Sequence, residues 1–305
     1  MDATPSYLEQ LFGSGLLLPT GVEGLYGRSQ MFEDVLERVA ARLGCWGRER
    51  DAELLRFPPG MHRDSLVRAG YFKSFPQLAG TVHAFCGNER EHREMLRCME
   101  AGSDEWLDQQ KPTDLALTPA ACYPVYPITA QRGALPEQGR LFDVRSWCFR
   151  REPSIDPVRM QLFQMQEYVR IGTPEQVLEF RNGWMEYGKE LFQRLQVPHE
   201  IDVANDPFFG RSGKLLADSQ REQKFKFELL IPVTSVEKPT ACMSFNYHAD
   251  HFGQTWGIRT AQGGTAHTAC IGFGLERIVL ALFRHHGLDA NAWPADVRNV
   301  LWAAA

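Results

Sequence analysis

Two neighbouring segments near the middle of the 305-residue chain restrict its fold more than any other feature. Residues 142–149 and 162–170 have strand-like patterns, and a polar loop containing Pro153 and Pro157 separates them. Antiparallel strands can be joined by such a loop, whereas parallel strands need a long crossover that is usually a helix. Further strands are expected at 52–57, 122–127, 225–231 and 240–247, and helices at 29–43, 88–100, 174–195 and 275–283. The prediction is an α+β fold, in which helices flank an antiparallel sheet.

The ends of these segments carry their own signals. Gly44 is expected to close the first helix, and Pro58 to end the strand before it, since proline cannot donate to a sheet. Residues 102–112 are interpreted as a surface connection. We expect residues 1–21 to form an N-terminal arm and 22–305 to form one domain.

Charge and cysteine content exclude some classes of function. The formal net charge of -5 provides no general basic field of the kind that releases counterions from nucleic acids. Seven cysteines, an odd number spread along the chain, favour reduced thiols and a cytoplasmic location over a disulfide framework. The longest apolar stretch, residues 278–283, is far shorter than the roughly 20 residues of a membrane helix.

The polar loop between the two central strands carries the first chemical signal. An antiparallel pair would bring Arg150, Arg159 and Phe163 to the same end of the hairpin. Two guanidinium groups can bind phosphate oxygens through charge-assisted hydrogen bonds, and an aromatic ring can stack on a purine. The alternative is a surface hairpin with solvated arginines.

A second signal is Gly272-Phe273-Gly274-Leu275-Glu276-Arg277, which leads directly into the apolar helix 275–283. A cation near a helix N-terminus is electrostatically unfavourable, so Arg277 should have an anionic partner. A structural turn is the usual explanation for Gly-x-Gly.

Together, the two segments resemble the second and third signature motifs of class II aminoacyl-tRNA synthetases. The resemblance implies that Arg150, Glu152 and Arg277 are catalytic, with Arg150 at the α-phosphate of ATP and Arg277 at the γ-phosphate. It also implies that Arg159 and Met160 contact the nucleotide and that Phe163 stacks on adenine. The first motif would be residues 29–59, which form the dimer interface in that family, so a homodimer is expected.

Shorter matches resemble the seryl branch of the class. They are Cys-Phe-Arg-Arg-Glu at 148–152, Phe-Glu-Leu-Leu-Ile-Pro at 227–232 and Ser-Phe-Asn at 244–246. The resemblance implies amino-acid contacts for Ser244 and Asn246, and ATP contacts for Lys226, Ala241, Cys242 and Met243. ATP should arrive with Mg²⁺, but Thr240 stands where seryl enzymes have an acidic ligand, which leaves Glu237 as a nearby candidate.

Cys122, Glu167 and Cys270 offer three ligands for a tetrahedral Zn²⁺. Scattered Cys and Glu residues are normally packing and surface residues, and spacing alone does not reveal a metal site. The zinc-dependent seryl-tRNA synthetases of methanogens carry Cys, Glu and Cys at corresponding places. In that family the α-amino group of the substrate is the fourth ligand, so Cys122 and Glu167 are also expected to bind the amino acid.

The chain also resembles the amino acid:[carrier protein] ligases, which are bacterial homologues of those synthetases. Residues 70–76 (Gly-Tyr-Phe-Lys-Ser-Phe-Pro) and 245–248 (Phe-Asn-Tyr-His) carry this likeness. Only some 20 residues precede the first-motif helix, so residues 22–305 are expected to be the catalytic domain, without a separate tRNA-binding domain. The resemblance implies that glycine or alanine is converted to its adenylate and transferred to the phosphopantetheine thiol of a carrier protein, with no tRNA involved. The sequence does not decide between glycine and alanine.

Basic residues after the predicted helix 174–195 are candidates for docking this acceptor. Carrier proteins are usually acidic, and Arg211, Lys214 and Arg221 belong to the densest cationic cluster there. A solvated charged face explains each of them equally well. Lys226 and Glu228 alternate with apolar neighbours and are expected to point into the active face of the sheet. The nine histidines, His248 and His251 among them, are interpreted as structural or polar-surface residues.

Two other functions remain open at this point. One is a truncated seryl-tRNA synthetase, and the other is a noncatalytic paralogue that binds an adenylate without turnover. The complete set of Arg150, Glu152, Phe163 and Arg277 argues against the second.

Overall fold

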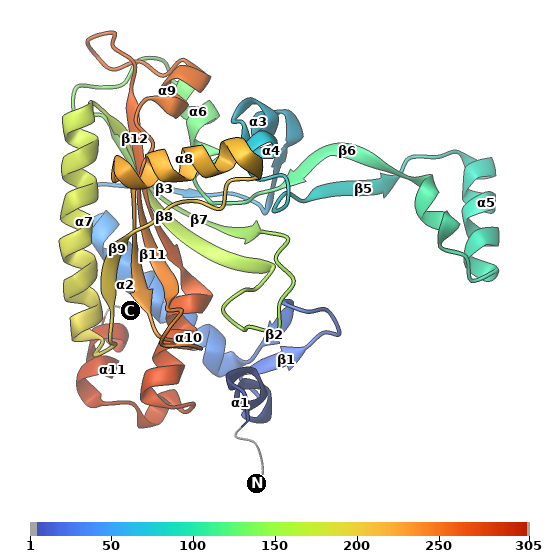
Figure 1. Ribbon diagram of the computed structural model, residues 1–305, viewed down its shortest axis with the longest axis horizontal. Coiled ribbons are helices and arrows are strands. Elements are labelled where there is room, and N and C mark those ends of the chain that lie inside the picture. Colours follow the sequence, from blue (N-terminus) through green and yellow to red (C-terminus); the bar gives the residue numbers. More distant parts are fainter. Residues whose placement is uncertain (1–4, 304–305) are drawn as a thin grey trace.

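A seven-stranded sheet forms the centre of the molecule (Figure 1). The computed structural model describes residues 5–303, apart from the side chains at 211, 212, 215, 216, 219 and 222. In spatial order the strands are β3 (Glu53–Arg56), β7 (Arg140–Phe149), β8 (Leu162–Gly172), β12 (His267–Gly274), β11 (Thr240–Tyr247), β10 (Lys226–Ile231) and β9 (Glu200–Val203). Adjacent strands are antiparallel except for the edge pair β3–β7. The predicted α+β class and the β7–β8 hairpin are therefore confirmed.

Helices cover one face of this sheet and enclose the main core. They are α2 (Gln30–Arg48), α7 (Pro174–Arg194), α10 (Leu275–His286) and α11 (Ala295–Trp302). Thr173 caps α7 in a reciprocal capping box with Gln176, and Pro174 occupies the first turn, where its missing N–H has no cost. Ile271 and Phe273 of β12 point into this core, so the alternate residues of β12 face the other side.

The expected end of the first helix at Gly44 is wrong, because α2 continues to Arg48. The helix is held against the sheet by Tyr168, whose hydroxyl donates to the Leu43 carbonyl (2.7 Å) and accepts from the Gly47 amide (2.9 Å). A Cβ at Gly47 would lie only 2.7 Å from that hydroxyl oxygen. Glycine at 47 thus permits a close helix–sheet contact within the helix.

The strand expected at 122–127 is also wrong. Residues 121–124 form a turn, and helix α6 (Val125–Gln131) follows. Pro124 is its N-cap and Pro127 lies in the first turn, where proline is tolerated. Val125, Tyr126 and Thr129 form the buried side of α6, at helical rather than alternate spacing.

Residues 81–117 form an arm that projects from the body (Figure 1). It consists of β5 (Thr81–Phe85), α5 (Glu89–Glu100), the 3-10 helix η1 (Asp104–Gln109) and β6 (Gln110–Leu117). The surface connection expected at 102–112 is therefore partly wrong, since it contains η1 and the start of β6. Helix α5 buries none of its residues and begins with a capping box between Asn88 and Glu91.

The remaining elements complete the body. Tyr7 of α1 (Tyr7–Gly13) donates its hydroxyl to the Leu280 carbonyl (2.7 Å), which fixes the N-terminal segment onto α10. The smaller elements are β1 (Leu17–Pro19), β2 (Tyr26–Arg28), β4 (Gly60–His62), α3 (Arg63–Arg68), α4 (Tyr71–Ser74), α8 (Gly210–Glu222), α9 (His251–Trp256) and the 3-10 helix η2 (Ala290–Ala292). Within residues 5–303, every helix is too short or too polar to cross a membrane.

Candidate active site

A cavity of about 690 Å³ lies over the sheet face opposite the main core. Strict alternation along four strands supplies its floor. The side chains that share this face are Phe163, Met165 and Glu167 of β8, Cys270 of β12, Ser244 and Asn246 of β11, and Lys226 and Glu228 of β10. Gly272 opens the middle of the floor, because a Cβ there would lie 2.9 Å from the Ser244 hydroxyl oxygen. The sheet thus brings most of the sequence-predicted residues into one cavity.

One end of the cavity, which we call the nucleotide end, carries two guanidinium groups. The Nε of Arg150 donates to the Pro119 carbonyl (3.1 Å), and its guanidinium carbon lies 5.5 Å from the Phe163 ring centre. Arg277 donates to the carbonyls of Val158 (2.8 Å) and Ala241 (3.0 Å). Among the described residues, neither guanidinium forms an ion pair. Burial and the nearby positive charge of Arg150 lower the pKa of Arg277.

The other residues predicted to bind ATP divide into two groups. Those that line the cavity are Glu152, Met160, Phe163, Lys226, Ala241, Cys242 and Met243. Arg159 does not line it: its side chain is 55% exposed and lies 3.6 Å from Glu152. Glu237, the candidate Mg²⁺ ligand, is exposed on a loop outside the cavity and accepts a hydrogen bond from Ser235. The carboxylates that line the cavity are Glu152, Glu167, Asp206, Glu228 and Glu276.

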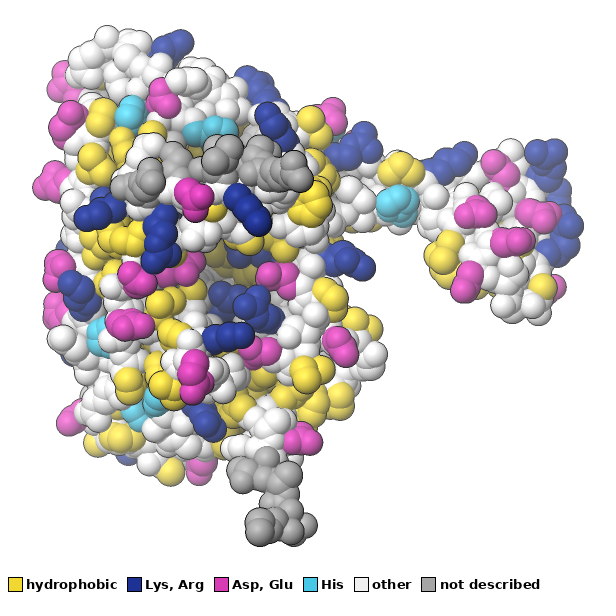
Figure 2. Space-filling view, in the orientation of Figure 1, with side chains coloured by type: hydrophobic (Ala, Val, Ile, Leu, Met, Phe, Trp, Pro, Cys, Tyr) yellow, Lys and Arg dark blue, Asp and Glu magenta, His cyan; other side chains and the backbone are white. Residues whose placement is uncertain are grey.

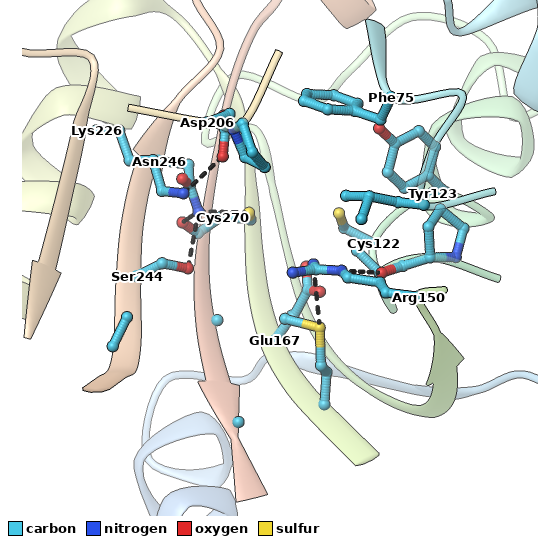
Figure 3. A pocket seen from close by; sticks show the side chains of 18 of the residues that line it. Phe75, Cys122, Tyr123, Arg150, Glu167, Asp206, Lys226, Ser244, Asn246 and Cys270 are labelled. Atoms are coloured by element: carbon cyan, nitrogen blue, oxygen red, sulfur yellow. Dashed lines mark hydrogen bonds and ion pairs between the residues drawn. The ribbon is translucent and has the colours of Figure 1, made fainter. Parts of the chain in front are cut away.

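A second part of the cavity, which we call the thiol end, brings together Cys122, Glu167 and Cys270, with Arg150 beside Glu167 (Figure 3). One potential ligand atom from each lies within 4.8 Å of the other two, and all three residues are buried. Cys122 comes from the turn before α6, while Glu167 and Cys270 stand on the adjacent strands β8 and β12. Glu167 Oε1 accepts from the Ala121 amide (2.9 Å), but its Oε2 is buried without a partner.

The protonation of this cluster is unusual. A hydrogen bond from Cys122 to Cys270 lowers the pKa of Cys270 and raises that of Cys122. Burial raises the pKa of Glu167 to about 8. Two sulfurs and a carboxylate oxygen without a partner, at this spacing, fit the donor set of a tetrahedral zinc ion with one open position.

A loop and α8 form the roof of the cavity. Asp206 Oδ1 lies 2.5 Å from Lys226 Nζ, and Glu228 Oε1 lies 2.9 Å from the same nitrogen. The ring of Phe208 stacks on Phe75 of the segment after α4, with centroids 5.0 Å apart. Although burial opposes both charges, Lys226 lowers the pKa of Asp206, and the two carboxylates raise that of Lys226.

Two of the predicted docking residues, Lys214 and Arg221, are exposed on α8 outside the cavity lining. The side chain of Arg211, the third, lies outside the described residues. Arg221 is 3.9 Å from Asp202, a weak contact between exposed groups. Figure 2 shows further Lys and Arg side chains in the hollow beneath α8, on the same face of the molecule.

Sequence reasoning missed several residues of the site. Tyr71, Tyr123, Asp206 and His248 line the cavity, and the hydroxyl of Tyr71 is buried there without a partner. They come from α4, the turn before α6, the roof loop and the end of β11. These segments are far apart in the sequence and carry no shared pattern. The resemblance at residues 70–76 and 245–248 includes Tyr71 and His248, but it assigned neither of them a role in the site.

Comparisons with known proteins agree with this arrangement. Residues 106–286 match the tRNA synthetase class II core domain (G, H, P, S and T). The chain is 51% identical over 302 residues to "amino acid--[acyl-carrier-protein] ligase 1" of Bradyrhizobium diazoefficiens, covering 98% of this chain and 92% of that protein. It is 30% identical over 285 residues to the "type-2 serine--tRNA ligase" of Methanopyrus kandleri, covering 86% of this chain and about half, 52%, of that protein.

A solved structure shows the same fold. The M. kandleri SerRS, crystallised with A. aeolicus tRNASec, matches with a TM-score of 0.82 at 21% identity, over 97% of this chain and 60% of that chain. The predicted class II catalytic fold is therefore confirmed.

Proposed function

The chain belongs to the amino acid–[acyl-carrier-protein] ligases and carries the class II synthetase core domain, and from this premise we propose which substrates it uses and which residues bind them. It is a ligase that activates an amino acid with ATP and transfers it to a carrier protein. We propose that the amino acid is glycine or alanine. Large side chains, among them Tyr123, Met165 and Phe252, line the cavity together with the thiol cluster and favour a small substrate.

One observation carries the adenylation step: Arg150 and Arg277 line the cavity and form no ion pair among the described residues. A guanidinium without a carboxylate partner is a ready site for phosphate oxygens. The substrate carboxylate would attack the α-phosphorus of ATP, forming the P–O bond of the adenylate while pyrophosphate leaves. Arg150 would stabilise the charge on the α-phosphate, Arg277 would bind the γ-phosphate, and Phe163 would stack on adenine.

Further contacts follow from the lining of the nucleotide end. Glu152, Met160, Ala241, Cys242 and Met243 would surround the nucleotide. Arg159 is outside the lining and would reach ATP only by rotating away from Glu152. Lys226 would approach the nucleotide only if it exchanged one of its two carboxylate partners. ATP would arrive with Mg²⁺, for which Glu152 and Glu228 are nearer candidates than Glu237.

Cys122, Glu167 and Cys270 would hold one Zn²⁺ per subunit. When bound, the ion would supply a Lewis-acid position for the unprotonated α-amino group of the substrate. The neighbouring Ser244 and Asn246 would contact the same amino acid: Asn246 Nδ2 donates to Ser244 Oγ (3.0 Å), so both polar groups face the cavity (Figure 3). The amino acid would thus be oriented with its carboxylate toward Arg150.

The second half-reaction needs a thiol acceptor. We propose that the phosphopantetheine sulfur of the carrier attacks the acyl carbon of the adenylate, forming a thioester while AMP leaves, and that tRNA is not charged. Lys214 and Arg221, with Arg211, would dock an acidic carrier on α8. This acceptor is supported by the 51% identity to a carrier-protein ligase over nearly the whole length of both chains.

The assembly and the division of the chain are also proposals. Leu54 is 62% exposed on the edge strand β3, and an exposed apolar edge favours pairing with a second copy, hence a homodimer. We propose residues 22–305 as the catalytic unit and 1–21 as an arm packed on it. Cys122, Cys148, Cys242 and Cys270 are buried thiols outside any disulfide, which supports a cytoplasmic location.

An exchange assay tests the activation step. The purified protein would be incubated with ATP, labelled pyrophosphate and each standard amino acid in turn, and its metal content measured. We expect exchange with glycine or alanine and about one zinc per subunit. Exchange with serine alone, or no exchange with any amino acid, would contradict the proposed substrate.

A further inference from the structure

Two side chains outside the proposed ligand set approach the sulfur of Cys270. Asn246 Nδ2 lies 3.4 Å from it, and His248 Nε2 lies 3.7 Å from it. Asn246 is the direct cross-strand partner of Cys270, so the register of β11 against β12 places its amide there. His248 directly follows the end of β11, and its ring reaches the same sulfur.

The second nitrogen of His248 determines which atom carries the proton. Nδ1 lies 3.0 Å from the hydroxyl oxygen of Thr268, which is fully buried on β12. Two backbone hydrogen bonds, from the His248 amide to the Thr268 carbonyl (2.9 Å) and from the Thr268 amide to the Ala249 carbonyl (3.0 Å), fix this pairing. If the hydroxyl donates to Nδ1, the neutral ring carries its hydrogen on Nε2, which then donates to the Cys270 sulfur.

Aromatic packing prevents the imidazole from rotating away. The ring of Phe252 meets it edge-on with centroids 5.1 Å apart, and Tyr126 meets it in the same way at 6.4 Å. Tyr126 and Phe252 are themselves stacked at 3.9 Å. A ring held by two aromatic neighbours and one hydroxyl is preorganised for the contact with sulfur.

His248 is not itself a fourth ligand. The cluster of ligand atoms within 4.8 Å of one another contains Cys122, Glu167 and Cys270, and His248 is not a member. Two thiolates and a carboxylate bring three negative charges to a divalent ion, so hydrogen-bond donors to sulfur offset part of the excess charge. Such outer partners orient ligands, and their removal typically costs 10–100-fold in metal affinity.

We infer that His248 is a positioning residue for the Cys270 thiolate, with Asn246 as a second donor and Thr268 as the group that fixes the ring. This inference rests on the proposed zinc site. It gives His248 a function in place of the structural role expected from the sequence.

The test compares zinc retention among matched variants of the whole chain. Each protein is loaded with zinc, and its loss to a chelator is followed by metal analysis. His248→Phe keeps a ring of similar size without the donor, and we expect its zinc affinity to fall roughly 10–100-fold. His248→Gln, which retains an N–H donor, should recover most of the loss, and Thr268→Val should show a smaller loss in the same direction.

A spectroscopic readout and a control separate positioning from general damage. In cobalt-substituted protein, the thiolate-to-cobalt charge-transfer band should shift in His248→Phe and return toward wild type in His248→Gln. His83→Phe is the control, since His83 lies on β5 of the projecting arm and does not line the cavity, and it should behave as wild type.

The outcomes distinguish the inference from its premise. A His248→Phe protein with wild-type zinc affinity and an unshifted band would overturn the role of His248 and leave the zinc site intact. Wild-type protein that binds no zinc would overturn both. If His248→Phe fails to fold, near-wild-type zinc retention in His248→Gln together with a measurable loss in Thr268→Val would support the donor role. A Gln variant as poor in zinc affinity as Cys270→Ala, or wild-type retention in Thr268→Val, would contradict it.

Discussion

The nucleotide end and the thiol end of the cavity share one sheet face, yet they are built differently. At the nucleotide end, Arg150 and Phe163 belong to one hairpin, and Arg277 begins a helix directly after a strand. At the thiol end, Cys122, Glu167 and Cys270 come from a turn and two strands that are separated by 45 and 103 residues. The residues of the nucleotide end lie in short continuous sequence motifs. Those of the thiol end are distant in the sequence and are brought together by strand pairing.

The two ends also differ in charge. The nucleotide end carries guanidinium groups without ion-pair partners among the described residues, whereas the thiol end carries sulfurs and a carboxylate. A phosphate and an amine would therefore bind to different groups on this sheet face, with the reacting carboxylate between them. Four predictions test this separation.

The largest effect is expected at the nucleotide end. Arg150→Ala should lower amino-acid-dependent ATP–pyrophosphate exchange by roughly 10²–10³-fold, because a positive group would be lost from the developing charge. Arg151→Ala is the matched control, since that side chain is exposed, and it should keep activity within about threefold. Equal activity in the two variants would show that Arg150 does not contact the phosphate.

At the thiol end, Cys122→Ser should remove zinc and lower the exchange rate by about 10²-fold, since several kcal/mol of metal-dependent binding would be lost. The KM for the amino acid should rise while calorimetric ATP affinity stays near wild type. The exposed Cys86 provides the control variant Cys86→Ser. A comparable loss of ATP affinity would show that the two ends are not independent.

Phe163→Leu should have an intermediate effect confined to the nucleotide. Stacking of a base on an aromatic ring is worth about 1–3 kcal/mol, so the KM for ATP should rise at least about fivefold. The KM for the amino acid should remain unchanged. Steady-state kinetics with each substrate varied in turn would measure both KM values. A raised KM for the amino acid with an unchanged KM for ATP would show that adenine does not stack on Phe163.

The smallest effect is expected in the roof. Asp206→Asn should lower the free energy of unfolding by about 1–2 kcal/mol near neutral pH, because Lys226 loses its closest carboxylate. Since the folded-state pKa of Asp206 is lowered, this stabilisation is fully present above the unfolded value of 3.8 and is lost as pH falls through the folded pKa.

Denaturant unfolding of the wild type and Asp206→Asn would check this pH dependence. The difference in stability between the two should shrink below about pH 3.8. Asp202→Asn, at an exposed position, is the control and should change stability by less than about 0.5 kcal/mol. A difference that stays constant down to acid pH would exclude the ion pair as its source.

The contrast between the two ends explains which parts of the structure could be predicted from the sequence. Periodicity predicted the central strands and α7 within two residues, because alternation and capping are local signals. Periodicity failed at residues 122–127, where helix α6 begins and its buried residues, Val125, Tyr126 and Thr129, follow helical spacing. The prediction that the helix ends at Gly44 was wrong, because glycine is tolerated inside a helix where the sheet packs closely against it.

The site was less accessible to sequence reasoning than the fold. Spacing alone gave a phosphate-binding hairpin, and the resemblance to a family was needed to pair Cys122 with Cys270. Asp206 was not identified by either, and His248 was interpreted only as a structural or surface residue, because their roles depend on a roof loop and on Thr268 of a neighbouring strand. Contacts of this kind are determined by tertiary packing and leave no pattern along the chain.

The mass of a carrier protein after reaction tests the central claim most directly. The enzyme would be incubated with ATP, glycine or alanine, and either a phosphopantetheinylated carrier or tRNA. We predict that the carrier gains the mass of one aminoacyl group, that the gain is lost in Arg150→Ala and in Cys270→Ala, and that tRNA is not charged. A carrier of unchanged mass beside charged tRNA would contradict the account.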